Sequence, residues 1–240
     1  MNYTDAGFRA VYHNFVVVSI NESVEALLKR LPGGDEANGI LAYGYHDRDG
    51  GITLEVLGAA IVGPDGFRYA EGTEESMKLR IRTVEDEDLL ICSDQDGRLS
   101  EAFADKLKAL SVYDVPEEVE QTRDMEFLDP GRHERFIDDV LVLFMKEGME
   151  NEEIWVRVTG HTDETIIGYL IDEPFHDIGY HQGDTVSFRV YQNDEGNAYV
   201  YYVDLDEEAP EQEAPEEEPQ EQPEKPKKAP AAKRKKKEET

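Results

Sequence analysis

The first half of the chain places its hydrophobic residues in short runs that are separated by turn residues. The run at 15–18 is apolar and mostly β-branched, which is typical of a buried strand. Further apolar runs at 40–45, 52–62 and 77–84 end in segments rich in Gly, Pro, Asp or Glu, which favour turns. We therefore predict an antiparallel sheet in this half.

Three segments of the same half show helical signals. Apolar residues recur at helical intervals over 24–31, and Ser19 with a glutamate three residues later has the spacing of a capping box. A second helix is predicted over 100–110 with Ser100 as its N-cap, and Pro116 marks a third helical start. We expect these helices to cover one face of the sheet, which makes the region an α+β domain.

The second half has the pattern of short strands. In two of its apolar segments, 154–158 and 185–191, inward and outward residue types alternate, and the connections are rich in turn residues. Five such segments can bury their edges by curling into a small antiparallel β-barrel, so we expect an SH3-like or similar partial barrel. The five predicted strands are 140–145, 154–158, 165–171, 185–191 and 198–205.

Turn signals and a change of composition divide the chain into three parts. The Asp-Pro-Gly sequence that begins at Asp129 suggests a boundary, so we predict an α+β domain over 1–128 and a β-rich module over 129–205. Beyond it, six of the eleven prolines fall within 206–240, where apolar residues other than Ala vanish. Such a segment cannot bury enough surface to offset its ordering entropy, so we predict a disordered tail.

The predicted tail is segregated by charge. It has ten acidic and no basic residues over 206–224, then eight basic and no acidic residues over 225–237. The cationic end could bind an acidic partner or, weakly, nucleic acid. The alternative is a solvating tail whose basic end folds back loosely on the chain's own acidic surface.

The β-rich module resembles a known family at several places in the right order. These are the Trp-Val strand that begins at Trp155, the Gly-x-Leu segment at Gly168, the acidic-Pro turn at Glu173 and the Gly-Asp strand start at Gly183. Over about 138–190 they are similar to the bacterial module called domain of unknown function 2314. The resemblance implies a bacterial cytoplasmic protein, and it supplies no catalytic residue.

Charge and cysteine content narrow the classes of function. A formal net charge of −30 gives a negative potential that repels phosphate backbones, so nucleic acid is not expected to bind the folded body. The one cysteine, Cys92, lies in an apolar run and is predicted to belong to the core. No stretch approaches the roughly 20 apolar residues of a membrane span, and a cytoplasmic location is expected.

One loop collects residues that could ligate a divalent metal. Imidazoles and carboxylates are the ligands such ions prefer, and two histidines and several carboxylates lie close together in this segment. The alternative is that these side chains are solvated or brace the loop, because acidic loops arise by chance in so acidic a chain. The candidate ligands are His161, His176, Asp177 and His181, with Asp172 and Glu173 beside them.

Aromatic residues of the β-rich module are the second set of candidates. Tyr and Trp combine a large contact area with a polar tip, so those that reach the surface would form a binding patch. The alternative is that most of them fill the barrel interior. The candidate binding residues are Trp155, Tyr169, Phe175 and Tyr180.

Two functions follow from these candidates. The sequence has no phosphate-binding loop, cofactor motif or nucleophile elbow, which favours a binding or regulatory role over catalysis. The first hypothesis is therefore an acidic module that binds another protein, in the manner of an immunity or inhibitor protein that binds a basic target such as a nuclease toxin. The second is a divalent-metal-dependent hydrolase built on His161, His176 and His181.

Overall fold

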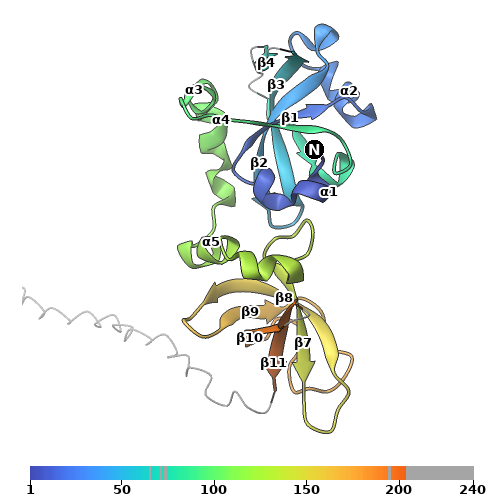
Figure 1. Cartoon of the computed structure of the whole chain (residues 1–240), viewed down its shortest axis with the longest axis vertical. Helices are drawn as coiled ribbons and strands as arrows, with labels where there is room; N and C mark the ends of the chain where they lie inside the picture. Colours follow the sequence, from blue (N-terminus) through green and yellow to red (C-terminus); the bar gives the residue numbers. More distant parts are fainter. Residues whose placement is uncertain (65, 71, 73–74, 194–195, 204–240) are drawn as a thin grey trace, which may run out of the picture. The chain divides into compact units, whose positions relative to one another are not determined.

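The computed structural model describes residues 1–64, 66–70, 72, 75–193 and 196–203, which contain two β-sheets (Figure 1). The predicted α+β class is confirmed. The predicted disordered tail at 206–240 lies outside the described residues. Among the helices that are described, none is both long and apolar enough to cross a bilayer.

The first sheet is antiparallel throughout, as predicted. Its order is β4-β3-β2-β1-β6, with β5 paired to β3 beside this path. The hairpin between β2 and β3 is its longest pairing and turns at 48–50, where a turn was expected. The strands are β1 (Phe15–Ser19), β2 (Gly39–Asp47), β3 (Gly51–Gly63), β4 (Gly66–Tyr69), β5 (Lys78–Arg80) and β6 (Leu89–Cys92).

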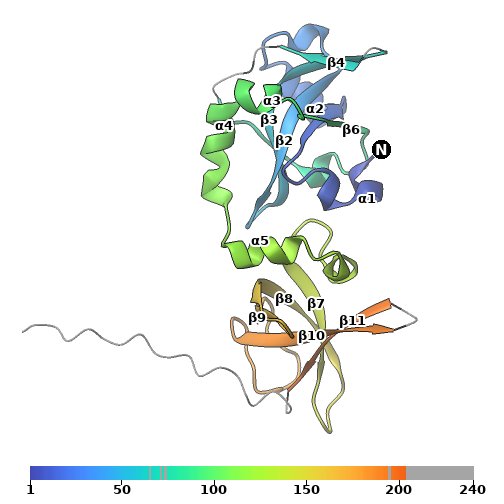
Figure 2. The same cartoon turned by 60° about the vertical axis from the view of Figure 1, so that its left-hand side comes forward.

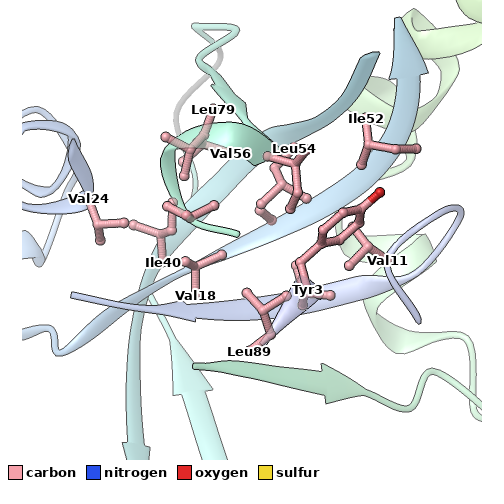
Figure 3. Packing of buried hydrophobic residues seen from close by; sticks show 14 of the residues in the cluster. Tyr3, Val11, Val18, Val24, Ile40, Ile52, Leu54, Val56, Leu79 and Leu89 are labelled. Atoms are coloured by element: carbon pink, nitrogen blue, oxygen red, sulfur yellow. The ribbon is translucent and has the colours of Figure 1, made fainter. Parts of the chain in front are cut away.

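Both faces of this sheet are buried, whereas the sequence suggested that one would be. Successive side chains of a strand point to opposite faces. Val18 and Ile40 pack with Val24 of the helix α2 (Glu22–Leu28) on one face (Figure 3). Val17 packs with Phe103 in a separate cluster on the other. The near-continuous burial of β2 and β3 follows from this double cover.

The remaining helices are short, and those between residues 98 and 131 follow the first sheet and precede the barrel in sequence (Figure 2). The α-helices are α1 (Tyr3–Ala6), α3 (Arg98–Ala102), α4 (Ala104–Ala109) and α5 (Glu117–Arg123). The 3-10 segments are Phe8–Ala10, Gly34–Glu36, Ile81–Thr83, Leu110–Tyr113 and Glu126–Gly131. The start that Pro116 predicted is confirmed, because Pro116 is the N-cap of α5.

Two predicted helix caps were wrong. Ser19 is the last residue of β1, and Asn21 caps α2 instead by accepting a hydrogen bond from the Val24 amide at 2.9 Å. At the second site the helix begins at Arg98, and Asp94 accepts from the amide of Ser100 at 2.9 Å. In both places another side chain accepts hydrogen bonds from the free amides of the first helical turn.

The five strands predicted in the second half are confirmed, and they form a closed barrel in the order β10-β11-β7-β8-β9. Closure comes from a parallel pair, β7 with β11, in which Val200 lies opposite Leu143. The prediction of a partial, fully antiparallel barrel is corrected in these two respects. The strands are β7 (Asp139–Met145), β8 (Glu152–His161), β9 (Ile166–Leu170), β10 (Thr185–Asn193) and β11 (Gly196–Tyr202).

The segment before Asp129 packs on the barrel. Helix α5 contacts β8, and Leu128 is fully buried in the barrel core. The hydroxyl of Tyr199 on β11 donates to the carbonyl oxygen of Phe127 at 2.9 Å. A domain boundary near Asp129 stays a prediction, but α5 and the 3-10 segment Glu126–Gly131 are structurally part of the barrel's surround.

Candidate functional site

The 171–184 loop, which joins β9 to β10, holds most of the candidate residues. Its centre is tied to the barrel by Ile178, whose side chain is buried in the barrel core. Its ends are joined by the Gly183 amide, which donates to the Leu170 carbonyl at 2.9 Å. Gly179 and Gly183 have positive φ angles, and glycine adopts this conformation without strain. The loop is therefore anchored at its middle and at its base.

Glu152 on β8 braces the first half of the loop. Its carboxylate accepts hydrogen bonds from the amides of Phe175 at 2.6 Å and His176 at 3.1 Å, and its Oε2 lies 3.2 Å from Nδ1 of His176. Burial opposes the charge of Glu152, but these hydrogen bonds outweigh burial and lower its pKa. The carboxylate thus fixes the backbone at Phe175 and the imidazole of His176 together.

Glu173 braces the second half from within the loop. It accepts from the Gln182 amide at 2.8 Å and lies 2.7 Å from Nδ1 of His181. The Gln182 amide and then His181 lower the pKa of Glu173, while the hydrogen bond and charge of Glu173 raise the pKa of His181. Both side chains are exposed, so this pair orients the turn more than it stabilises the fold.

Phe175 is held out into solvent by this frame. It is 88% exposed, the most of any large hydrophobic side chain in the described part of the chain. Its ring meets the His176 ring edge-on, with centroids 5.1 Å apart. The surrounding loop carries four carboxylates and no Lys or Arg. Asp172 and Asp177 of the same loop are exposed, so the site is a single aromatic anchor on an acidic loop.

Among the described residues, no ring contact joins the other predicted binding aromatics to Phe175, although Tyr180 lies in the same loop. Trp155 is half-buried against the ring of His133, with centroids 5.3 Å apart. The hydroxyl of Tyr169 accepts from Arg48 at 2.6 Å. Tyr180 packs on the barrel core, where its hydroxyl accepts from that of Tyr201 at 2.6 Å.

The three candidate histidines each have a different partner. His161 lies at the end of β8, where its Nε2 is 3.0 Å from the side-chain oxygen of Gln121. His176 and His181 are paired with Glu152 and Glu173, and Asp177 is exposed. Over the residues that the structure describes, no three His, Cys, Asp or Glu side chains come together in a group able to hold a metal ion. The contacts of His176 and His181 fit the alternative in which these residues brace the loop, because each pairs with a carboxylate that also accepts a loop amide.

Cys92 is in the core, as predicted. Its side chain is buried at the end of β6 among apolar residues of the first sheet. Burial raises the pKa of the Cys92 thiol to about 11, so the nucleophilic thiolate is scarce at neutral pH.

Sequence reasoning missed a buried charge cluster centred on Arg123 of α5. Its side chain is 2% exposed and donates two parallel hydrogen bonds to Asp138, at 2.8 and 2.7 Å. Another nitrogen of the same guanidinium donates to Glu120 at 3.0 Å, and Nη2 lies 3.2 Å from Nδ1 of the buried His46. Burial alone would raise the pKa of Asp138, but Arg123 lowers it well below its ordinary value. No sequence signal marks this arginine, since α5 reads as a polar surface helix.

Comparison of the chain with protein-family models, with curated proteins and with solved structures gives no match. The similarity of residues 138–190 to domain of unknown function 2314 stays a prediction.

Proposed function

We propose that this protein is a non-catalytic binding module that docks a basic protein partner through the 171–184 loop, with Phe175 as the anchor. The observation that carries the proposal is an 88% exposed phenylalanine on a loop whose conformation is fixed by two carboxylates. An exposed flexible phenylalanine is a poor anchor because binding must immobilise it. Here the backbone that carries Phe175 is already ordered in the folded protein, so binding does not have to order it.

The expected strength follows from the exposed area of the ring. Complete burial of a phenylalanine side chain in a partner's pocket is worth about 2 kcal/mol, or roughly thirtyfold in affinity. Aromatic anchors of this kind dominate many interfaces, while the surrounding charged rim controls partner choice and the rate of association. The net charge of −30 and the acidic loop select a basic partner, as an inhibitor of a cationic enzyme would require.

The test is quantitative affinity purification from a lysate of the source cell with three forms of the full chain. These are the wild type, Phe175→Ser and Tyr191→Ser, the last removing another exposed aromatic, which lies on β10. The proposal expects a protein of high isoelectric point that wild type and Tyr191→Ser retain and that Phe175→Ser loses. Its retention should fall as salt is raised, because salt screens the acidic rim.

Two results would contradict the proposal. One is a set of retained proteins that is the same for wild type and Phe175→Ser. The other is a partner lost equally with Phe175→Ser and Tyr191→Ser, since general stickiness of exposed aromatics would then explain the capture.

A further inference from the structure

A cavity of about 420 Å³ lies away from the 171–184 loop, where residues of the first sheet, of the segment before α5 and of the barrel meet. Its volume is in the range of small-molecule sites. The aliphatic part of its wall comes from the segment that leads into α5, from α5 itself and from β8. That part comprises Val112, Val115, Pro116, Val119 and Val158.

The polar part of the wall contains two arginines with different surroundings. Arg157 forms an ion pair with Asp139 through two hydrogen bonds of 2.6 and 2.8 Å, so the carboxylate already neutralises its charge. Arg48 donates to the hydroxyl of Tyr169 at 2.6 Å, and in the described part of the chain it forms no ion pair with a carboxylate.

The buried imidazole of His46, in the same wall, has one nitrogen with partners and one without any among the residues that the structure describes. Nδ1 of His46 is occupied by the charge cluster, because it lies 3.2 Å from Nη2 of Arg123 and 3.3 Å from Oδ2 of Asp138. Among the described residues, Nε2 of His46 has no hydrogen-bond partner although it is buried. Unsatisfied buried polar groups are rare in native proteins, and a cavity wall is where a ligand atom can satisfy one.

The carboxylates of the cavity do not cancel the charge of Arg48. Asp138 is held by Arg123. Asp114 is exposed to solvent, and its charge acts on the nearby rings of His13 and Tyr43. One guanidinium is therefore left for an anion.

We propose that this cavity binds a small monocarboxylate with an apolar body. The carboxylate pairs with Arg48 and the Tyr169 hydroxyl, and the apolar body packs on the valine-rich wall. One unpaired guanidinium matches a single carboxylate in charge and in its planar fork, whereas a phosphate dianion would keep an unmatched charge in an acidic protein. This inference is independent of the Phe175 docking proposal.

The probe is benzoate, titrated into the full chain by isothermal calorimetry. Acetate carries the charge without the apolar body, and benzamide carries the body without the charge. We expect saturable binding of benzoate, with both analogues and inorganic phosphate weaker by at least about tenfold. Absence of saturable benzoate binding overturns the proposal, and so does equal or tighter binding of acetate, benzamide or phosphate.

Three variants at exposed positions locate the site without disturbing the core. Arg48→Gln should weaken benzoate by at least about tenfold, and Thr159→Trp, which adds bulk at the cavity wall, should weaken it similarly. Arg82→Gln removes an exposed arginine that does not line the cavity and should leave the affinity unchanged. Unchanged binding in both Arg48→Gln and Thr159→Trp, or equal loss in Arg82→Gln, would place the benzoate elsewhere and overturn the assignment.

Discussion

Replacing Arg123 by methionine should destabilise the protein strongly, because it leaves the buried Asp138 without its cation. Arg123 is 2% exposed and Asp138 9% exposed by side chain, and two hydrogen bonds join them. Removal of one member of such a pair costs about 3–5 kcal/mol. For a folded part of this size, that corresponds to a fall of roughly 10 °C in melting temperature.

The assay is urea unfolding followed by the fluorescence of Trp155, with Arg82→Met as the matched control at an exposed arginine. The control should stay within about 0.5 kcal/mol of the wild type. The double variant Arg123→Met, Asp138→Leu should regain most of the loss of Arg123→Met, because no charge is then buried unpaired.

The destabilisation caused by Arg123→Met should depend on pH in a definite direction. In the wild type the pKa of Asp138 is lowered, so its contribution to the free energy of unfolding is complete above an unfolded pKa of about 3.9 and is lost as pH falls further. In Arg123→Met the carboxyl can protonate at higher pH, which relieves the penalty. The difference in free energy of unfolding between the two proteins should therefore become smaller as pH falls. A gap below about 1 kcal/mol at pH 7, or one that does not change with pH, would refute the buried-pair reasoning.

Three further predictions concern separate parts of the molecule. Cys92 should react slowly with a thiol reagent in native protein at pH 8 and rapidly in urea, since its pKa is raised to about 11; fast native labelling would contradict its burial. Glu152→Gln should speed hydrogen exchange of the Phe175 amide while leaving the β7 amides unchanged. In the wild type, the protection of the Phe175 amide from exchange should be lost as pH falls through the lowered pKa of Glu152. Deletion of 206–240 should leave the melting temperature unaltered, and a large drop would show that the tail supports the fold.

The sequence predicted the strands well because their information is local. Alternation within 154–158 and 185–191 reports which face of each strand is buried, and all five barrel segments were found. The parallel closure between β7 and β11 was missed, because two strands more than 50 residues apart carry no local mark of their direction. The strand expected over 77–84 is only β5 followed by a 3-10 turn, since apolar content alone does not distinguish a strand from a buried turn.

The candidate site was predicted in part. The clustering of His176, Asp177 and His181 in one loop was visible, but their partners were not, because Glu152 and Glu173 could not be told from many other carboxylates. Phe175 was named as a binding residue without any sign that it is exposed. Burial of Arg123 depends on contacts between segments remote in sequence, and no spacing rule reports it.

Photocrosslinking from position 175 is the sharpest test of docking through the 171–184 loop. A benzophenone amino acid replaces Phe175 in one protein and Tyr191 in another, and irradiation in source-cell lysate is followed by identification of the adducts. We expect one dominant adduct with a basic protein at position 175, absent at position 191 and reduced by salt. Adducts that are the same at both positions, or none at 175, would contradict the role of the 171–184 loop as a docking site.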